Sequence, residues 1–347
     1  MEILERMATG DHEEVAFCRD RNTGLRAIVA IHDTRLGPGL GGIRIREYGD
    51  ENQAMTDVLR LSQAMSYKNA CAGLDFGGAK AVLLAPLPAD RRAAFLAMGR
   101  IVAGFAGRYV ATEDMGMTEP DIAVLNEVTP HAVGRARDAG GSGDPSPHTA
   151  DGVFAGMRAA LRAAGLDDGF AGVRVAVQGC GKVGLGLIRH LVAVGADVVA
   201  ADTDESGVAA AREAGAGIVS PAEILFQDVE VIAPCAVGAV LDADSIPALR
   251  CRVVAGGANN QLATEADAAR LRERGIVYAP DFVINAGGVI NVGDELAPGG
   301  YDPARVARRV AAIETTLEGI FAEAAEAGRT TAEIAVARAR RRIEAAG

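Results

Sequence analysis

The chain has 347 residues, of which 49% are hydrophobic and 23% are charged, and its formal net charge is −11. This length predicts about two domains, and this composition is typical of a well-packed globular protein. An acidic balance argues against nucleic acid or an anionic membrane as the main partner. The five cysteines form no CxxC pair, so the sequence predicts neither a disulfide framework nor a metal site of the zinc type.

The N-terminal residues, the apolar stretches and the cysteines of the sequence bear on the cellular location of the protein. Residues 1–6 include acids and no apolar core of a signal peptide, and no run approaches the roughly 18 apolar residues of a membrane span. The unpaired cysteines fit a reducing compartment. We therefore expect a cytoplasmic protein that does not bind a membrane.

Strand and helix patterns alternate in the first part of the chain. Residues 25–32 are typical of a strand, apolar residues at helical spacing predict a helix over 55–65, and residues 79–84 are typical of the next strand. On this interpretation Lys68 lies just beyond the end of the helix. Lys80 lies where a glycine-rich loop enters the sheet.

These two lysines are the first candidate for chemistry. Lys68 and Lys80 occur among apolar residues and glycines, although lysines are ordinarily solvated and both could simply lie on a surface loop. Apolar surroundings disfavour the ammonium form, a second cation adds to this effect, and a lysine so placed can act as a base. The pair indicates an anion-binding and acid/base site in which one lysine holds a carboxylate.

A linker and a terminal helix set the expected domain ranges. Residues 140–147 are dense in Gly, Pro and Ser, so we place the boundary there and predict one α/β domain over 1–140 and a second over 141–328. A long helix is expected from about Pro303 to Ala327, and a Thr330–Glu333 capping box begins a helix over about 329–347. We expect that helix to pack back on the first domain, with a solvated face that carries Arg338, Arg340, Arg341 and Arg342.

A dinucleotide-binding pattern follows the linker. A buried-strand pattern over 173–177 leads into Gly179, Gly181 and Gly184, which form GxGxxG and open a helix. Such a motif alone could be any tight turn, but here the next strand ends at Asp202, 18 residues beyond Gly184. The glycines admit a pyrophosphate at the helix N-terminus. Asp202 would bind the adenosine ribose and repel a 2′-phosphate, which predicts NAD in a Rossmann-type domain.

Polar residues at the carboxyl ends of later strands extend this candidate site. In an open parallel sheet the ligand crevice lies at those ends, and Thr149 is expected to cap the helix that precedes the motif. Asn259 and Asn260 could instead only cap a turn. The candidate cofactor-binding residues are Thr149, Gly179, Gly181, Lys182, Val183, Gly184, Asp202, Cys235, Ala236, Ala258, Asn259, Asn260 and Asn285.

Six motifs, in order along almost the whole chain, carry a family resemblance. They cover residues 36–44, 66–69, 77–80, 113–116, 258–262 and 278–288. Together they resemble the leucine, phenylalanine and valine dehydrogenase branch of the amino acid dehydrogenases. The resemblance implies an N-terminal α/β domain for substrate binding and oligomerisation, a doubly wound Rossmann-type NAD domain, a cleft between them, and a homo-oligomer, either a dimer or an octamer.

The resemblance also implies roles for single residues. Lys68 would bind the substrate carboxylate, Lys80 would be the general base, and Asp114 would handle protons at the substrate amine. Asn260 would lie beside substrate and nicotinamide. The candidate pocket residues are Leu40, Gly41, Gly42, Thr112, Val289 and Val292. Because the residues of the pocket wall come from both parts of the chain, we expect the pocket to form only when the cleft between the domains closes.

The predicted reaction is reversible NAD-dependent oxidative deamination of an apolar L-amino acid to the 2-oxo acid and ammonia. Leucine, valine or isoleucine is the best prediction for the substrate, and an aromatic amino acid, in a specialised biosynthetic role, is the alternative. Ile43, Thr112 and His148 depart from the usual family pattern, so the sequence leaves the choice between them open. A catalytically silent nucleotide-binding assembly protein is a remote alternative, since such a protein would need none of Lys68, Lys80 and Asp114.

Overall fold

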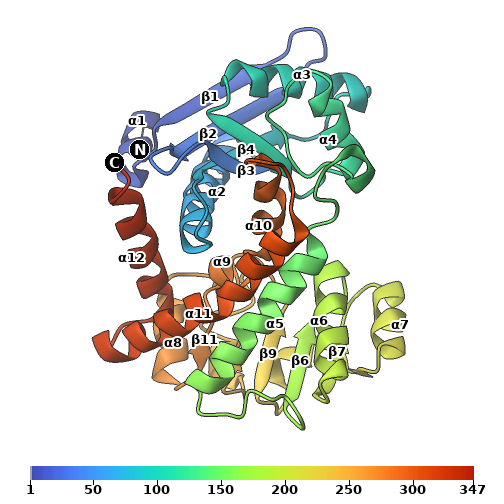
Figure 1. The fold of residues 1–347 in the computed structure, drawn as a ribbon, viewed down its shortest axis with the longest axis vertical. Coiled ribbons are helices and arrows are strands. Elements are labelled where there is room, and N and C mark those ends of the chain that lie inside the picture. Colours follow the sequence, from blue (N-terminus) through green and yellow to red (C-terminus); the bar gives the residue numbers. More distant parts are fainter. Residues whose placement is uncertain (1) are drawn as a thin grey trace. The chain divides into compact units, whose positions relative to one another are not determined.

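The computed structural model describes residues 2–347 as two compact units (Figure 1). One unit holds the residues up to Asp144 together with Val289–Asp302 and Ala339–Gly347, and the other holds Pro145–Gly288 and Pro303–Arg338. The predicted α/β fold class with a parallel second sheet is confirmed. The division differs from the expected ranges because the chain returns to the first unit twice, once at Val289 and again at Ala339.

The first unit is built on a five-stranded mixed sheet in the order β1-β2-β4-β3-β5. The strand β2 pairs antiparallel with β1 and β4, whereas β3 pairs parallel with β4 and β5. The strands are β1 Glu14–Arg19, β2 Arg26–Asp33, β3 Gly39–Arg46, β4 Gly77–Leu84 and β5 Tyr109–Glu113. The helices are α1 Ile3–Gly10, α2 Glu51–Cys71, α3 Arg91–Gly104 and α4 Glu119–Asn126, with single turns η1 Arg137–Ala139 and η4 Asp294–Leu296.

The two faces of this sheet are covered differently. Figure 1 shows α2 on one face and α3 and α4 on the other. Ala79, Ala81 and Leu83 of β4 pack in the core beneath α3, whereas Val82 packs in the core beneath α2. Because successive side chains of a strand point to opposite faces, Lys80 shares the α2 face with Val82.

Helix α2 lies close against β4 because glycine occupies the contact. A Cβ on Gly78 would lie 2.2 Å from the backbone nitrogen of Ser66, a distance that no side chain tolerates. Asn69 near the helix end donates through Nδ2 to the carbonyl of Gly77 at 2.7 Å. The helix runs to Cys71, so the expectation that Lys68 follows the helix is wrong, and Lys68 lies in its last turn. Lys80 likewise lies inside β4 rather than at its entrance.

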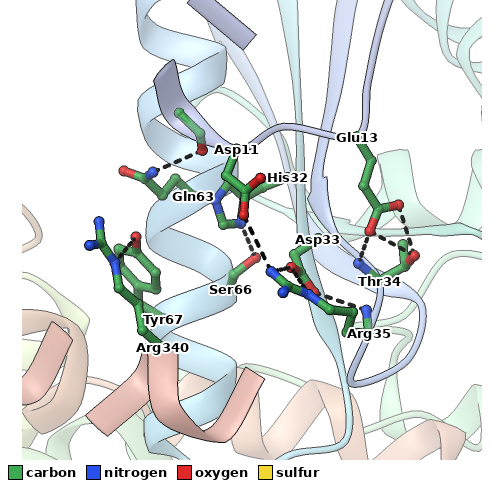
Figure 2. A network of polar contacts seen from close by, with 11 residues as sticks. Asp11, Glu13, His32, Asp33, Thr34, Arg35, Gln63, Ser66, Tyr67 and Arg340 are labelled. Carbon is green, nitrogen blue, oxygen red and sulfur yellow. Dashed lines mark hydrogen bonds and ion pairs between the residues drawn. The ribbon is translucent and has the colours of Figure 1, made fainter. Parts of the chain in front are cut away.

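A network of polar contacts holds the middle of α2 in place, as Figure 2 shows. Ser66 lies 2.7 Å from Nδ1 of the buried His32 on β2. Burial lowers the pKa of His32 to about 4, and the neighbouring His12 adds to this effect, so the ring is neutral near pH 7. Gln63 donates to the carbonyl of Gly10 at 3.1 Å. These contacts fix the turn that immediately precedes Lys68.

The last helix, α12 (Thr331–Glu344), also contributes to this network. Arg340 donates to the hydroxyl of Tyr67 at 3.1 Å (Figure 2) and lies over its ring. Arg342 donates to the carbonyl of Leu74 at 2.7 Å, and Arg338 to Glu323 at 2.7 Å. The predicted Thr330–Glu333 capping box is confirmed. The expectation of a merely solvated arginine face is wrong, since these three arginines anchor the helix.

The second unit contains a six-stranded parallel sheet in the order β11-β10-β9-β6-β7-β8. The strands are β6 Arg174–Gln178, β7 Asp197–Ala201, β8 Gly217–Ile218, β9 Val231–Pro234, β10 Val253–Val254 and β11 Val277–Tyr278. The helices are α5 Ser146–Ala163, α6 Lys182–Ala193, α7 Glu205–Glu213, α8 Ala266–Glu273, α9 Asp281–Ile284 and α11 Pro303–Ala327, with single turns η2 Ile224–Phe226 and η3 Ile246–Ala248. The strand order reverses between β6 and β9, which is where ligands bind in sheets of this type.

One local expectation in this unit needs correction. Helix α5 begins at Ser146, with Pro145 at its N-cap, so Thr149 lies within the first turn and donates to the carbonyl of Pro145 at 3.1 Å. Farther along the chain, Gly287–Gly293 form helix α10. No helix among residues 2–347 is long and apolar enough to cross a membrane.

One buried carboxylate ties the returning segment to the rest of the first unit. The side chain of Glu295 is fully buried and accepts from the backbone nitrogens of Ser142 at 2.7 Å, Gly134 at 3.0 Å and Arg135 at 3.2 Å. It also pairs with the Arg135 guanidinium at 3.1 Å. A carboxylate in this position is stable only because all of these donors converge on it.

We expect Glu295→Ala to lower the free energy of unfolding by roughly 3 kcal/mol, because buried N–H donors then lose their acceptor. The measurement is chemical denaturation followed by circular dichroism. Glu127→Ala is the matched control, because Glu127 forms an exposed ion pair with Arg92 and such pairs contribute little. Equal midpoints for the two variants would contradict the assigned role of Glu295.

Candidate functional site

Two cationic side chains contact one carboxylate oxygen at the α2 face of the first sheet. Lys80 Nζ on β4 lies 2.8 Å from Oδ2 of Asp114, which directly follows β5. Arg44 Nε on β3 lies 3.0 Å from the same oxygen. Lys80 is only 5% exposed and Arg44 only 8%. The two predicted catalytic residues Lys80 and Asp114 are therefore brought into direct contact.

The charge state of Asp114 follows from these contacts. Burial alone would raise the pKa of Asp114, but the Lys80 and Arg44 cations hold the pKa of that carboxyl well below its usual range. Asp114 is thus an anion at any working pH. As an anion, Asp114 can bind a cation or orient a proton donor. It would take up a proton only if Lys80 or Arg44 moved away from it.

A glycine makes room for this ion pair. A Cβ on Gly42 of β3 would lie 2.7 Å from Cβ of Asp114 and 3.2 Å from Nζ of Lys80. The register sets Leu40 beside Gly78 and Ile43 beside Ala81, which places Gly42 opposite Lys80. The glycine pair that the sequence marked as pocket lining therefore has a steric reason.

Lys68 lies in the part of α2 that contacts these strands most closely. Ser66 approaches Gly78, and Asn69 donates to the carbonyls of Gly77 and Leu40. Lys68 lies between them in the sequence, in the last turn of the helix, and is partly exposed. The structure thus brings the helix turn that carries one lysine onto the strand that carries the other.

Apolar side chains lie near the cluster in the same unit. Gly134 lies next to both Thr112 and Val292, since a Cβ there would be 3.4 Å from Thr112 Oγ1 and 3.8 Å from Val292 Cγ1. Gly293 likewise lies beside Leu40. Val289 and Val292 belong to the segment that returns to the first unit. The candidate wall residues therefore all belong to the first unit, although Val289 and Val292 come from the second part of the chain.

The glycine motif of the second unit forms a tight turn between β6 and α6. Gly179 has a φ of +99°, and a Cβ on Gly184 would lie 1.9 Å from the carbonyl oxygen of Gly179. Gly181 is the N-cap of α6, and nothing lies within 4 Å of a Cβ placed on it. Lys182 is exposed at the first position of the helix. This open helix N-terminus can receive a phosphate group.

Asp202 follows β7 and faces the same turn. Its carboxylate accepts from the backbone nitrogens of Cys180 at 2.5 Å and Asp204 at 2.9 Å. Burial alone would raise the pKa of Asp202, but these backbone donors hold it below the usual value. The acid predicted to bind a ribose therefore also holds the glycine turn in shape.

The other cofactor candidates gather around Asn285. Asn285 Nδ2 donates to Oδ1 of Asn259 at 2.7 Å and to the carbonyl of Gly257 at 3.2 Å. Its Oδ1 is buried and accepts no hydrogen bond from residues 2–347. Val183 and Cys235 both lie next to Gly257, and burial raises the pKa of the Cys235 thiol to about 11.

The remaining candidates lie at nearby strand ends and at the start of α5. Ala236 lies against Gly179, and Thr149 lies against Gly288. Asn260 has a left-handed φ of 53°, and its carbonyl accepts from Ala239 at 2.6 Å, while Ala258 is buried after β10. Ala236 and Ala258 follow β9 and β10, at the carboxyl ends where a parallel sheet binds its ligand.

Comparison with known proteins identifies the family. The description "Glu/Leu/Phe/Val dehydrogenase, dimerisation domain" matches residues 12–131, and "Glutamate/Leucine/Phenylalanine/Valine dehydrogenase" matches residues 140–216 and 209–343. The chain belongs to the Glu/Leu/Phe/Val dehydrogenase family. The resemblance found in the sequence is thereby confirmed, and the protein is an amino acid dehydrogenase.

Individual relatives align over most of this dehydrogenase. It is 46% identical to leucine dehydrogenase of Bacillus cereus, over 92% of this chain and 88% of that protein. It is 45% identical to valine dehydrogenase of Streptomyces virginiae, over 92% and 90% of the two chains. The crystal structure of L-tryptophan dehydrogenase from Nostoc punctiforme superposes with a TM-score of 0.86 at 39% identity and covers 99% of both chains.

Two charged residues beside the Lys80–Asp114 pair, Arg44 and Asp57, were not predicted from the sequence. Arg44 ends the motif over residues 36–44, and a charged residue among the apolar residues of a strand is a signal of a buried partner. Asp57 accepts from Nη1 of Arg44 at 3.3 Å and from the hydroxyl of Tyr48 at 2.8 Å. It occurs among the apolar residues of α2, where a lone acid is a comparable signal.

We expect Gly42→Ala to lower kcat/KM by at least about tenfold, because the new methyl group would push Asp114 away from Lys80 and small displacements of reacting groups are costly. Gly104→Ala is the matched control, because a Cβ on Gly104 meets nothing within 4 Å. Steady-state kinetics of the two variants provide the measurement. Similar rates for both would show that the glycine does not shape the site.

Proposed function

We propose that this dehydrogenase catalyses the reversible NAD-dependent oxidative deamination of an apolar L-amino acid, with leucine, valine or isoleucine as the best substrate. The observation that carries the proposal is the Lys80–Asp114 ion pair on a sheet face with apolar neighbours. A deamination needs a base for water and an anchor for the substrate carboxylate. Lys80 and Lys68 would supply these two functions.

The proposed roles of the side chains follow from their positions. Lys68 binds the substrate carboxylate as a cation. Lys80, as a neutral amine, takes a proton from the water that attacks the substrate iminium carbon, and Asp114 orients the amine during release of ammonia. Lys80 Nζ lies 2.8 Å from Oδ2 of Asp114, and only an amine without its extra proton can act as the base.

The residues of the second unit fit NAD. Gly179, Gly181 and Gly184 would receive the pyrophosphate at the start of α6, and the unpaired Oδ1 of Asn285 could accept from the nicotinamide amide. When bound, NAD accepts the hydride from the substrate Cα. Asp202 would bind the ribose hydroxyls, for which its carboxylate oxygens still offer lone pairs.

The pocket walls support an apolar substrate. Leu40, Val289 and Val292 are buried and offer no charge, so an acidic substrate side chain would lose its hydration without gaining a partner. The leucine and valine dehydrogenases among the relatives agree with this choice. An aromatic substrate is the second candidate, because a relative that is 39% identical is named tryptophan dehydrogenase.

We also propose a homo-oligomer in the cytoplasm. The first matched family description refers to a dimerisation domain, and Cys18, Cys71, Cys180, Cys235 and Cys251 are all free thiols, which suits a reducing compartment. A dimer or an octamer would fit, and sedimentation of the purified protein would tell them apart. The partners in catalysis are small molecules, namely amino acid, 2-oxo acid and ammonia.

The substrate proposal predicts an order of kcat/KM values measured by NADH formation. Leucine, valine and isoleucine should react best, phenylalanine and tryptophan should be slower, and glutamate should be poorest because its charge costs several kcal/mol in an apolar pocket. Phenylalanine or tryptophan ahead of leucine would overturn the branched-chain choice. Glutamate ahead of all apolar amino acids would overturn the pocket itself.

The cofactor proposal predicts a strong preference for NAD over NADP. A 2′-phosphate would meet the Asp202 carboxylate, and like charges at close range repel. Asp202→Ser should narrow the preference by raising kcat/KM with NADP relative to NAD. Asp197→Ser, at the exposed beginning of the same strand, is the control. Equal use of both cofactors by the unmodified enzyme would contradict the assignment of Asp202.

A further inference from the structure

The site holds a cation to which the proposed reaction gives no role. Arg44 binds the same oxygen of Asp114 as Lys80 does, at 3.0 Å and 2.8 Å respectively. Nη1 of Arg44 lies 3.3 Å from Oδ2 of Asp57, and the hydroxyl of Tyr48 donates to the same Asp57 oxygen at 2.8 Å. Arg44 and Asp57 are both more than nine-tenths buried. The row Lys80, Asp114, Arg44, Asp57 thus alternates in charge through the first unit.

The position of Arg44 creates a conflict that bears on the base. Asp114 stabilises the ammonium form of Lys80, whereas a base must be a neutral amine. Because both nitrogens contact one oxygen, they are at most about 6 Å apart, where like charges repel appreciably in a protein interior. Arg44 also occupies part of the hydrogen-bonding capacity of Asp114 Oδ2. Both effects weaken the stabilisation that Asp114 gives to the ammonium form of Lys80.

We propose that Arg44 is a positioning residue that favours the neutral form of the Lys80 amine by sharing Oδ2 of Asp114. Asp57 limits this effect because its carboxylate partly offsets the positive charge of Arg44. The inference rests on the proposed function only in that Lys80 is the base. Arg44 touches neither substrate nor cofactor in this account. It acts through Asp114.

Other charged and titratable groups lie on the elements around the cluster, including Glu113 at the end of β5. Burial raises the pKa of Tyr48, with a further contribution from Asp57, and burial raises that of Tyr109, with a further contribution from Asp114, so both remain protonated donors. Arg46 lies over the Tyr48 ring on the outer part of β3, and α2 also carries Lys68. None of these groups shares the Asp114 oxygen in the contacts described. Changes at Arg44 and Asp57 should therefore dominate.

The test measures the protonation of Lys80 directly. The unmodified protein, without amino acid or cofactor, is treated with acetic anhydride over a range of pH, and acetylation of the peptide that contains Lys80 is quantified by mass spectrometry. Only the neutral amine reacts. In Arg44→Met the labelling profile should move to higher pH by about one to two units, and in Asp57→Asn it should move to lower pH by less.

The same variants are then assayed for turnover. The acid limb of kcat/KM should move with the labelling profile, and Arg44→Met should recover most of its activity at high pH. Arg26→Met, an exposed arginine at the start of β2, should leave both profiles in place. A merely structural role would lower activity at every pH and would not shift two variants in opposite directions.

The outcomes separate this inference from the proposed function. An unmoved labelling profile in folded Arg44→Met, or a shift in labelling without a shift of the kcat/KM limb, overturns the role of Arg44. If Arg44→Met does not fold, the downward shift in Asp57→Asn decides, and its absence overturns the proposal. If Lys80→Ala retains normal turnover, the base assignment itself fails, whatever the labelling shows.

Discussion

The carboxylate of Asp114 is the point on which the arrangement of the first unit depends. It accepts from two buried cations, Lys80 and Arg44, that arrive on two different strands. Two buried cations on their own would be strongly unfavourable, and one anion between them removes most of that cost. The order and register of β3, β4 and β5 bring these three side chains together, so that each buried charge has a partner.

Glycines and the helix α2 make that arrangement possible. Gly42 leaves space for the Lys80–Asp114 contact, and Gly78 lets the backbone of α2 approach β4 near Ser66. The polar contacts around α2 and the arginines of α12 then fix the helix along its length. As a result Lys68, which the sequence alone placed just beyond the end of the helix, is carried by the last turn of α2. A substrate anchor held this way loses little conformational entropy on binding.

In the second unit, the acid proposed to bind the ribose also has a structural role. Asp202 holds the backbone of the glycine turn and stands at the strand end where a ribose would bind. A change there will affect the turn as well as the cofactor preference, which is why an exposed acid on the same strand is needed for comparison. In Asn285 the amide nitrogen donates to Asn259 and Gly257, whereas the buried amide oxygen accepts no hydrogen bond from residues 2–347.

The sequence by itself determined the fold class, the dinucleotide motif, the two lysines and the family, because alternation, helical spacing and glycine position are local properties. It also marked Lys80, Gly42 and Thr112 as candidate catalytic or pocket residues. Only the tertiary structure decided that they meet, since the strand order β4-β3-β5 depends on contacts between residues far apart in the chain. The return of Val289–Asp302 to the first unit was beyond prediction for the same reason, because Glu295 finds its donors more than 150 residues earlier. The role of Arg44 became visible only once Lys80 and Arg44 were seen on one oxygen.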